Sequence, residues 1–202
     1  MRQNFRITHI KTHIMRKLLL TLVFVLMAMI AFAQGEHMTF KGIPMQGTLN
    51  AFVQKLKGKG FTYMEASKDG ALLRGKFATY DDCLVCVYTE KNNVSSVAVV
   101  FPGEETWNAI TGSYYSLKGM LTEKYGTPET VEMFSNGDPG SDFLRFYAIL
   151  KDECMYKSEF KAKNGSVILS MMKIDYKTAS IVISYVDNIY REAARKTMMD
   201  DL

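Results

Sequence analysis

The feature that most constrains the fold is a series of short runs in which apolar and polar residues alternate, separated by turn residues. One set of runs covers 61–66, 71–79, 83–90 and 94–101, and a second covers 131–134, 143–150, 154–162, 166–174 and 179–186. Alternation with period two, in runs rich in β-branched and aromatic residues, is typical of half-buried strands. Short spacers such as Asn164-Gly165 connect such strands as hairpins. The sequence therefore predicts antiparallel meanders.

Helical periodicity appears in two segments, one before each set of strands. Thr48 can cap a short helix that Gly58 ends, and Thr106 can cap a longer helix that ends at Gly126. A third helical segment over 189–200 closes the chain. Helices and strands thus follow one another in separate blocks, which is typical of an α+β protein.

The order of a helix followed by a meander occurs twice, and two short sequence echoes support an internal repeat. One echo pairs the helix starts at 48–52 and 106–110, and the other pairs the acidic residues that precede Cys83 and Cys154. We therefore predict an α+β fold of two tandem units, each with a helix packed on an antiparallel sheet of about four strands. The first unit spans residues 34–101, and the second spans residues 102–202 with the C-terminal helix.

Residues 1–33 have the order of a secretory signal peptide. A basic pair at 16–17 precedes an apolar run over 18–30, which closes on Ala31-Phe32-Ala33. This order predicts cleavage near Ala33-Gln34 and export to the periplasm or the extracellular space. The apolar run is shorter than the roughly 20 residues of a spanning helix, so no membrane span is expected after cleavage.

Removal of the predicted signal peptide changes the composition of the working protein. The chain has 25 Lys and Arg and 21 Asp and Glu, and five of the basic but none of the acidic residues lie in 1–33, which leaves 20 against 21. A net charge near −1 gives no electrostatic footprint for nucleic acid. Met1 and Met15 are both candidate starts, and from Met15 residues 1–14 would not be translated.

The distribution of histidine argues against the common catalytic and metal sites. His9 and His13 lie in the predicted signal peptide, and His37 lies near the start of the mature chain. A Ser-His-Asp triad, a Cys-His pair or a His-based metal site needs an imidazole in the folded body. We therefore predict no catalytic residue, no metal ligand and no cofactor-binding residue.

The three cysteines allow two interpretations. Cys83 and Cys86 form a C-x-x-C inside a predicted strand, where their Cα atoms would be about 10 Å apart, beyond disulfide reach. Cys83 and Cys154 occupy equivalent strand starts in the repeat, and an exported compartment permits a disulfide between them. The alternative is that all three cysteines remain reduced core residues.

Aromatic residues are the feature with most potential for interaction. The candidate recognition face consists of Tyr63, Tyr80, Tyr88 and Tyr115, of which the first three fall in predicted strands. Tyr is enriched in protein–protein hot spots, which favours an interaction role. The alternative is that these rings simply belong to the core, as aromatic residues in strands commonly do.

The mature chain resembles small exported proteins of unknown function from Gram-negative gut anaerobes. The residues that carry this resemblance are Phe40-Lys41-Gly42-Ile43-Pro44-Met45-Gln46-Gly47-Thr48, Phe52, Leu56, Lys59-Gly60-Phe61, Phe101-Pro102, Lys124-Tyr125-Gly126 and Asp200-Asp201-Leu202. The order of one helix and about four strands is also similar in outline to the β-lactamase-inhibitor-protein fold and to the small outer-membrane assembly lipoprotein module. Both folds bind other proteins, so the resemblance implies a binding role without catalysis.

We therefore predict an exported, non-enzymatic module that binds a protein or a cell-envelope component. Two other classes remain open. One is a small-molecule carrier that uses the space between the two predicted sheets. The other is an envelope hydrolase or oxidoreductase that works without histidine, through Asp and Glu, Tyr or Cys86.

Overall fold

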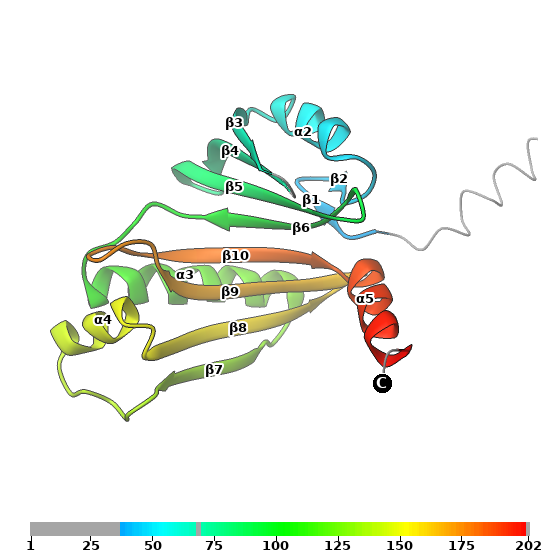
Figure 1. The fold of residues 1–202 in the computed structure, drawn as a ribbon. Helices are drawn as coiled ribbons and strands as arrows, with labels where there is room; N and C mark the ends of the chain where they lie inside the picture. Colours follow the sequence, from blue (N-terminus) through cyan, green and yellow to red (C-terminus); the bar gives the residue numbers. More distant parts are fainter. Residues whose placement is uncertain (1–36, 68–69, 201–202) are drawn as a thin grey trace, which may run out of the picture. The chain divides into compact units, whose positions relative to one another are not determined.

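One antiparallel sheet organises the chain in a computed structural model that describes residues 37–67 and 70–200 (Figure 1). Its strands are β3 (Thr62–Ser67), β4 (Gly70–Phe77), β5 (Tyr80–Glu90), β6 (Asn93–Val100), β7 (Glu129–Phe134), β8 (Cys154–Ala162), β9 (Gly165–Lys173) and β10 (Ala179–Asp187). They lie in the order β3-β4-β5-β6-β10-β9-β8-β7. A small sheet of β1 (Thr39–Phe40) and β2 (Ile43–Pro44) precedes them. The predicted α+β class is confirmed.

The two predicted meanders are joined at their last strands. Strands β6 and β10 pair antiparallel, from Val100 opposite Val182 to Ser96 opposite Val186. Hydrogen bonding therefore continues from β3 to β7, and the eight strands form one sheet where the sequence predicts a separate sheet in each unit. The two predicted sheets, between which the carrier alternative places its ligand, are therefore parts of one sheet. The predicted boundary at residue 101 falls in the link between the two meanders.

Four helices accompany the sheet in the described residues: α2 (Leu49–Lys57), α3 (Trp107–Tyr125), α4 (Asp142–Leu150) and α5 (Asn188–Asp200). The first two begin where the sequence predicts. The side chain of Thr48 accepts the N–H of Ala51 at 3.4 Å, and that of Thr106 accepts the N–H of Ala109 at 3.3 Å. Each cap satisfies a backbone donor that has no partner within the helix, which explains the position of both helix starts.

Helix α4 corrects the sequence prediction, which assigned a strand to 143–150. The hydroxyl of Ser141 accepts the N–H of Leu144 at 3.4 Å, and Asp142 lies in the first turn. Both features favour a helix N-terminus. Phe146 and Ile149 then bury one side of the helix. The run over 143–150 is apolar except for Arg145, so it is compatible with a strand as well as a helix, and the cap at Ser141 distinguishes the two structures.

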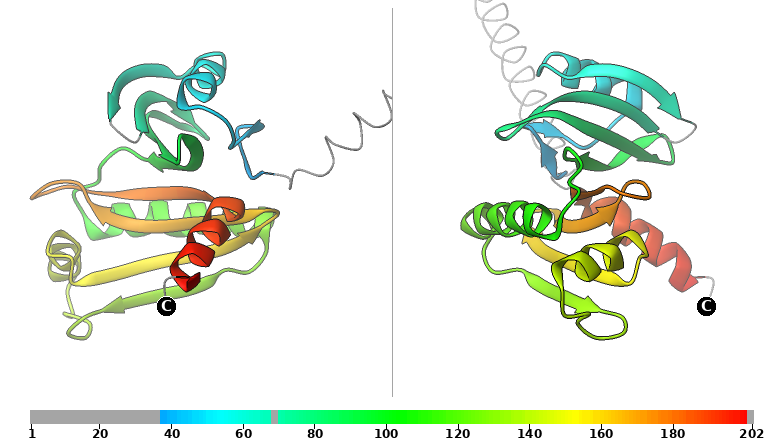
Figure 2. Two further views of the ribbon diagram at one scale, coloured as in Figure 1. Left: turned by 45° about the vertical axis from the view of Figure 1, so that its right-hand side comes forward. Right: turned by 90° about the vertical axis from the view of Figure 1, so that its left-hand side faces the viewer.

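Helices α2, α3 and α4 contact one face of the sheet, which we call the covered face, and the other is the open face. Strand residues on the covered face form the core, for example Val85, Leu169 and Ile183, each at most 1% exposed. Figure 2 shows α3 and α5 on opposite sides of the second meander. Helix α5 contacts the ends of β9 and β10, and lies at the opposite end of the strands from α4 (Figure 1).

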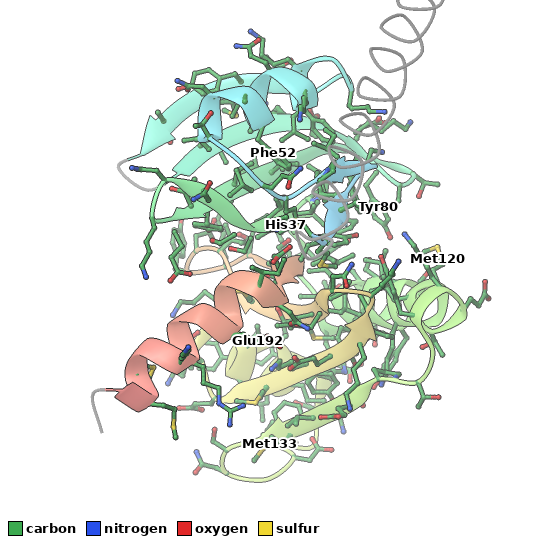
Figure 3. The ribbon with its side chains drawn as sticks, turned by 90° about the vertical axis from the view of Figure 1, so that its right-hand side faces the viewer. His37, Phe52, Tyr80, Met120, Met133 and Glu192 are labelled. Atoms are coloured by element: carbon green, nitrogen blue, oxygen red, sulfur yellow. The ribbon has the colours of Figure 1, made fainter. Side chains whose placement is uncertain are left out.

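The first described residues are attached to the start of α5 through one buried carboxylate. Asp187 is fully buried, and its Oδ2 accepts the N–H of Met38 at 2.7 Å and lies 3.2 Å from Nδ1 of His37. Its Oδ1 accepts the N–H of Ile189 at 2.9 Å, in the first turn of α5. His37 accordingly lies beside the top of α5 in Figure 3. The predicted signal peptide and its cleavage site lie outside the described residues.

Candidate functional site

The four tyrosines of the predicted recognition face do not lie together. Tyr88 is 48% exposed on the open face, whereas Tyr63 lies on edge strand β3, opposite the buried Leu73 of the covered face. Tyr80 packs edge-on against Phe101 at 4.9 Å between ring centroids, within the core layer. Tyr115 belongs to α3, and its hydroxyl donates to Glu132 of β7 at 2.9 Å. A single face that combines all four rings is therefore absent from the described structure.

The three cysteines are free thiols in the described structure. Cys83 lies within β5 and Cys154 begins β8, with β6, β10 and β9 between these strands. Four strand spacings of about 4.8 Å place the two far beyond the roughly 7 Å between Cα atoms that a disulfide spans. Burial raises the pKa of all three thiols, that of Cys154 to about 11. The structure thus agrees with the reduced alternative.

Three exposed methionines lie on the open face of the second meander. Met133 in β7 lies directly opposite Met155 in β8, and Met172 of β9 lies beyond the last β8–β9 pair, which joins Lys157 to Ser170. Their side chains are 51%, 53% and 50% exposed, whereas Phe160 on the covered face is fully buried. We call Met133, Met155 and Met172 the methionine row.

Apolar exposure continues from the methionine row into the turn between β9 and β10. Ile174 and Tyr176 in this turn are 52% and 83% exposed. The turn is ordered by Asp175, whose Oδ1 accepts the N–H groups of Lys177 and Thr178 at 2.9 and 2.8 Å. These hydrogen bonds hold the pKa of the Asp175 carboxyl below its usual value. The apolar side chains of the turn are therefore presented on a defined backbone.

A pocket of about 450 Å³ lies on the covered side of the same end, between the start of α3 and α4. Trp107, Phe143, Phe146 and Leu150 supply its apolar lining, and Lys177 of the β9–β10 turn reaches its rim. Phe143 is 78% exposed and stacks on Tyr147, with ring centroids 6.3 Å apart. Figure 1 shows α4, the β9–β10 turn and the start of β8 together at one end of the strands.

Ionic contacts fix the loop that leads into α4. Arg145 donates two hydrogen bonds of 2.8 Å to the carboxylate of Asp138, and a third of 2.9 Å to Asp142. The guanidinium and the N–H of Gly140 lower the pKa of Asp138 to about 2. A bidentate pair of this kind fixes direction as well as distance, so the loop is held against the N-terminal end of α4.

Among residues 37–67 and 70–200, no group of three or more His, Cys, Asp or Glu side chains is arranged to hold a metal ion. None of the helices in this part of the chain is long and apolar enough to cross a membrane. No family model, curated protein or solved structure matches the chain.

Sequence reasoning missed the methionine row because it weighed aromatic residues alone. Strand alternation would place Met155 and Met172 on the opposite face from Tyr156 and Met171. Alternation does not say which face is covered, nor which residues of neighbouring strands lie opposite one another. The one available signal is the abundance of Met, with 14 residues in the chain.

Proposed function

We propose that the chain is exported after loss of residues 1–33, and that it acts as a non-enzymatic module that binds a protein or a cell-envelope partner. The binding surface in this proposal is the end of the second meander, where the methionine row, the β9–β10 turn and α4 expose apolar side chains. Exposed apolar side chains that gather at one end of a fold are typical of interaction sites in soluble proteins.

The methionine row is the observation that carries the proposal. Half of each Met side chain is exposed, although all three lie on paired strands of the sheet rather than in loops. The backbone at the row is therefore rigid. Binding would reduce the conformational entropy of the side chains more than that of the backbone. Met side chains are unbranched and polarizable, so they adapt to the shape of an apolar partner.

The α4 pocket supports the same surface from the covered side. Aromatic and aliphatic side chains of a partner contribute most when they enter a desolvated pocket near other apolar contacts. The pocket offers such a place beside Phe143, and Glu105, Asp142 and Lys177 at its lining add polar contacts. A mixed apolar and polar surface of this type suits a folded protein or a peptide segment better than a lipid bilayer.

The proposal includes the tandem organisation predicted from the sequence. Each proposed unit begins with a capped helix, α2 or α3, and continues with antiparallel strands. The two units associate through the pairing of β6 with β10. Its outline is similar to that of the β-lactamase-inhibitor-protein fold, which binds proteins. The second unit differs from the first in α4, which is inserted after β7 and lines the proposed surface.

A pull-down with matched variants tests the proposed surface. The full chain is expressed with a C-terminal tag, and partners are captured from an envelope fraction with the native protein, Met155→Glu or Met120→Glu. Met120 is 48% exposed on α3, and Figure 3 shows it well separated from Met133. We expect Met155→Glu to reduce capture of a specific partner about tenfold or more, and Met120→Glu to leave it unchanged. Equal capture by both variants, with both folded by circular dichroism, would refute the proposed surface.

A further inference from the structure

A second pocket, of about 320 Å³, lies on the covered side of the sheet away from α4. Three lysines from three separate elements line it. Lys41 lies in the turn between β1 and β2, Lys124 lies in the last turn of α3, and Lys163 lies in the turn between β8 and β9. No Asp or Glu belongs to the lining. The pocket is thus a local concentration of positive charge in a chain that is close to neutral without residues 1–33.

Two of these lysines contact aromatic rings rather than carboxylates. Nζ of Lys41 lies 5.5 Å from the ring centroid of Phe77, and Nζ of Lys124 lies 4.9 Å from that of Tyr125. Among the described residues, neither ammonium group has an ion-pair partner. A cation–π contact leaves the hydrogen-bond donors of the ammonium group available to a ligand.

The position of Lys41 is costly for its backbone. Its φ is 52°, and the following Gly42 has a φ of 76°. A two-residue turn with both residues left-handed favours Asn or Gly at the first position, because a longer side chain is disfavoured there. The β5–β6 turn holds Lys91 in the same conformation, with a φ of 48°, so both turns accept lysine, and at Lys41 the side chain reaches the pocket.

Tyr185 supplies an independent observation. Its side chain in β10 is only 7% exposed and lines the pocket, with its ring packed edge-on against Phe40 at 5.2 Å between centroids. Its hydroxyl has no hydrogen-bond partner among the described residues. Every fully enclosed polar side-chain atom in this part of the chain has a hydrogen-bond partner. Because the Tyr185 hydroxyl has none, it is not fully enclosed and is accessible from the pocket. A buried hydroxyl without a partner is expensive unless a ligand or water completes its hydrogen bond.

We propose that this pocket binds a small organic anion, with a carboxylate or phosphate group held by Lys41, Lys124 and the Tyr185 hydroxyl. The ammonium groups supply charge-assisted hydrogen bonds, which are the strong ones for such groups. The rings of Phe77 and Tyr185 provide an apolar wall for the body of the ligand. The volume lies at the lower end of the range for ligand pockets, which restricts the ligand to a small molecule.

Calorimetric titration of the protein, purified after expression of the full chain, tests this inference. The probes are benzoate for a carboxylate, phenyl phosphate for a phosphate, and benzylamine as a cation of similar size. We expect saturable binding of at least one anion, weakened by added salt, and no binding of benzylamine. Binding of benzoate alone or of phenyl phosphate alone identifies the preferred group. No saturable binding of either anion, or equal binding of benzylamine, overturns the proposal.

Variants locate the binding to the pocket. Lys41→Gln and Lys124→Gln should each weaken binding of the anion about tenfold or more. Lys151→Gln is the matched control, because Nζ of Lys151 also lies over an aromatic ring, 4.8 Å from the centroid of Tyr147, but outside this pocket. Tyr185→Phe should weaken binding without lowering the melting temperature of the free protein, since the hydroxyl has no partner to lose. Equal affinity in all four variants, or a large loss of stability in Tyr185→Phe, would contradict the assignment.

Discussion

The hydroxyl oxygen of Tyr114 in α3 lies 2.7 Å from that of Ser158 in β8, and both side chains are fully buried. Ser158 also lies 3.1 Å from the hydroxyl of Thr130 in β7. This small network is a buried polar connection between α3 and the strands of the second meander, in addition to the more exposed contact of Tyr115 with Glu132. Ser158 has a second partner in Thr130, whereas among the described residues the Tyr114 hydroxyl has only Ser158. Removal of either hydroxyl should therefore change the stability by a different amount.

Tyr114→Phe should cost about 1 kcal/mol in the free energy of unfolding, since Ser158 keeps its contact with Thr130. Ser158→Ala should cost more, about 1–3 kcal/mol, because it leaves the buried Tyr114 hydroxyl without a partner. Urea denaturation of both variants measures the difference. The opposite order of the two losses would show that the hydroxyl of Tyr114 has another acceptor.

Alkaline pH should destabilise the protein through Tyr114. Burial raises the pKa of Tyr114 to about 12 from the ordinary value of 10, with a smaller opposing effect of the hydrogen bond to Ser158. The folded state therefore favours the neutral phenol, and its stabilising effect is complete below pH 10 and is lost as the pH rises toward 12. In Tyr114→Phe the decrease in stability over this range should be smaller. An unchanged decrease, followed by urea denaturation at each pH, would assign the alkaline sensitivity to other tyrosines.

The cysteines should all be reduced and slow to react in the folded protein. The thiolate is the reactive form, and burial raises the pKa of each thiol, so little thiolate is present at neutral pH. Mass spectrometry after alkylation without reductant should show three modified cysteines in urea and few in native buffer. A mass that corresponds to one modified cysteine in urea would reveal a disulfide and contradict the observed strand order.

Two glycines should respond to alanine in opposite directions. A Cβ at Gly165 would lie 2.5 Å from Sδ of Met38 and would also meet the carbonyl oxygen of Val186, whereas a Cβ at Gly119 in α3 meets no atom within 4 Å. Gly165→Ala should therefore destabilise the fold by about 1–3 kcal/mol through overpacking. Gly119→Ala should stabilise it by about 0.5–1 kcal/mol, because glycine is unfavourable within a helix. Thermal or urea denaturation of both variants provides the measurement.

Local signals were sufficient to predict α2, α3 and most of the strands. Thr48 and Thr106 are followed by helical periodicity, and each then forms the expected cap. The run over 143–150 is apolar except for Arg145 and is compatible with a strand as well as a helix. Its helical structure is favoured by the cap at Ser141 and by packing of Phe146, which the sequence does not display.

Contacts between distant residues were beyond sequence reasoning. The pairing of β6 with β10 joins residues more than eighty positions apart, and alternation alone does not select the partner strand. The methionine row depends on how β7, β8 and β9 are placed beside one another. The pocket lined by Lys41, Lys124 and Lys163 depends on turns and a helix end that are far apart in the sequence. Alternation would also place Tyr80 and Tyr88 on one side of β5, whereas Tyr80 packs against Phe101 and Tyr88 is exposed.

Site-specific photo-cross-linking in intact cells shows whether the methionine row contacts a partner. A photoreactive amino acid replaces Met155 in the methionine row or, as the control, the equally exposed Met120 on α3, in cells that express the full chain. We expect a discrete cross-linked product with a second protein or envelope component at position 155 and none at position 120. Absence of a product at 155, or the same product at both positions, would contradict binding through the methionine row.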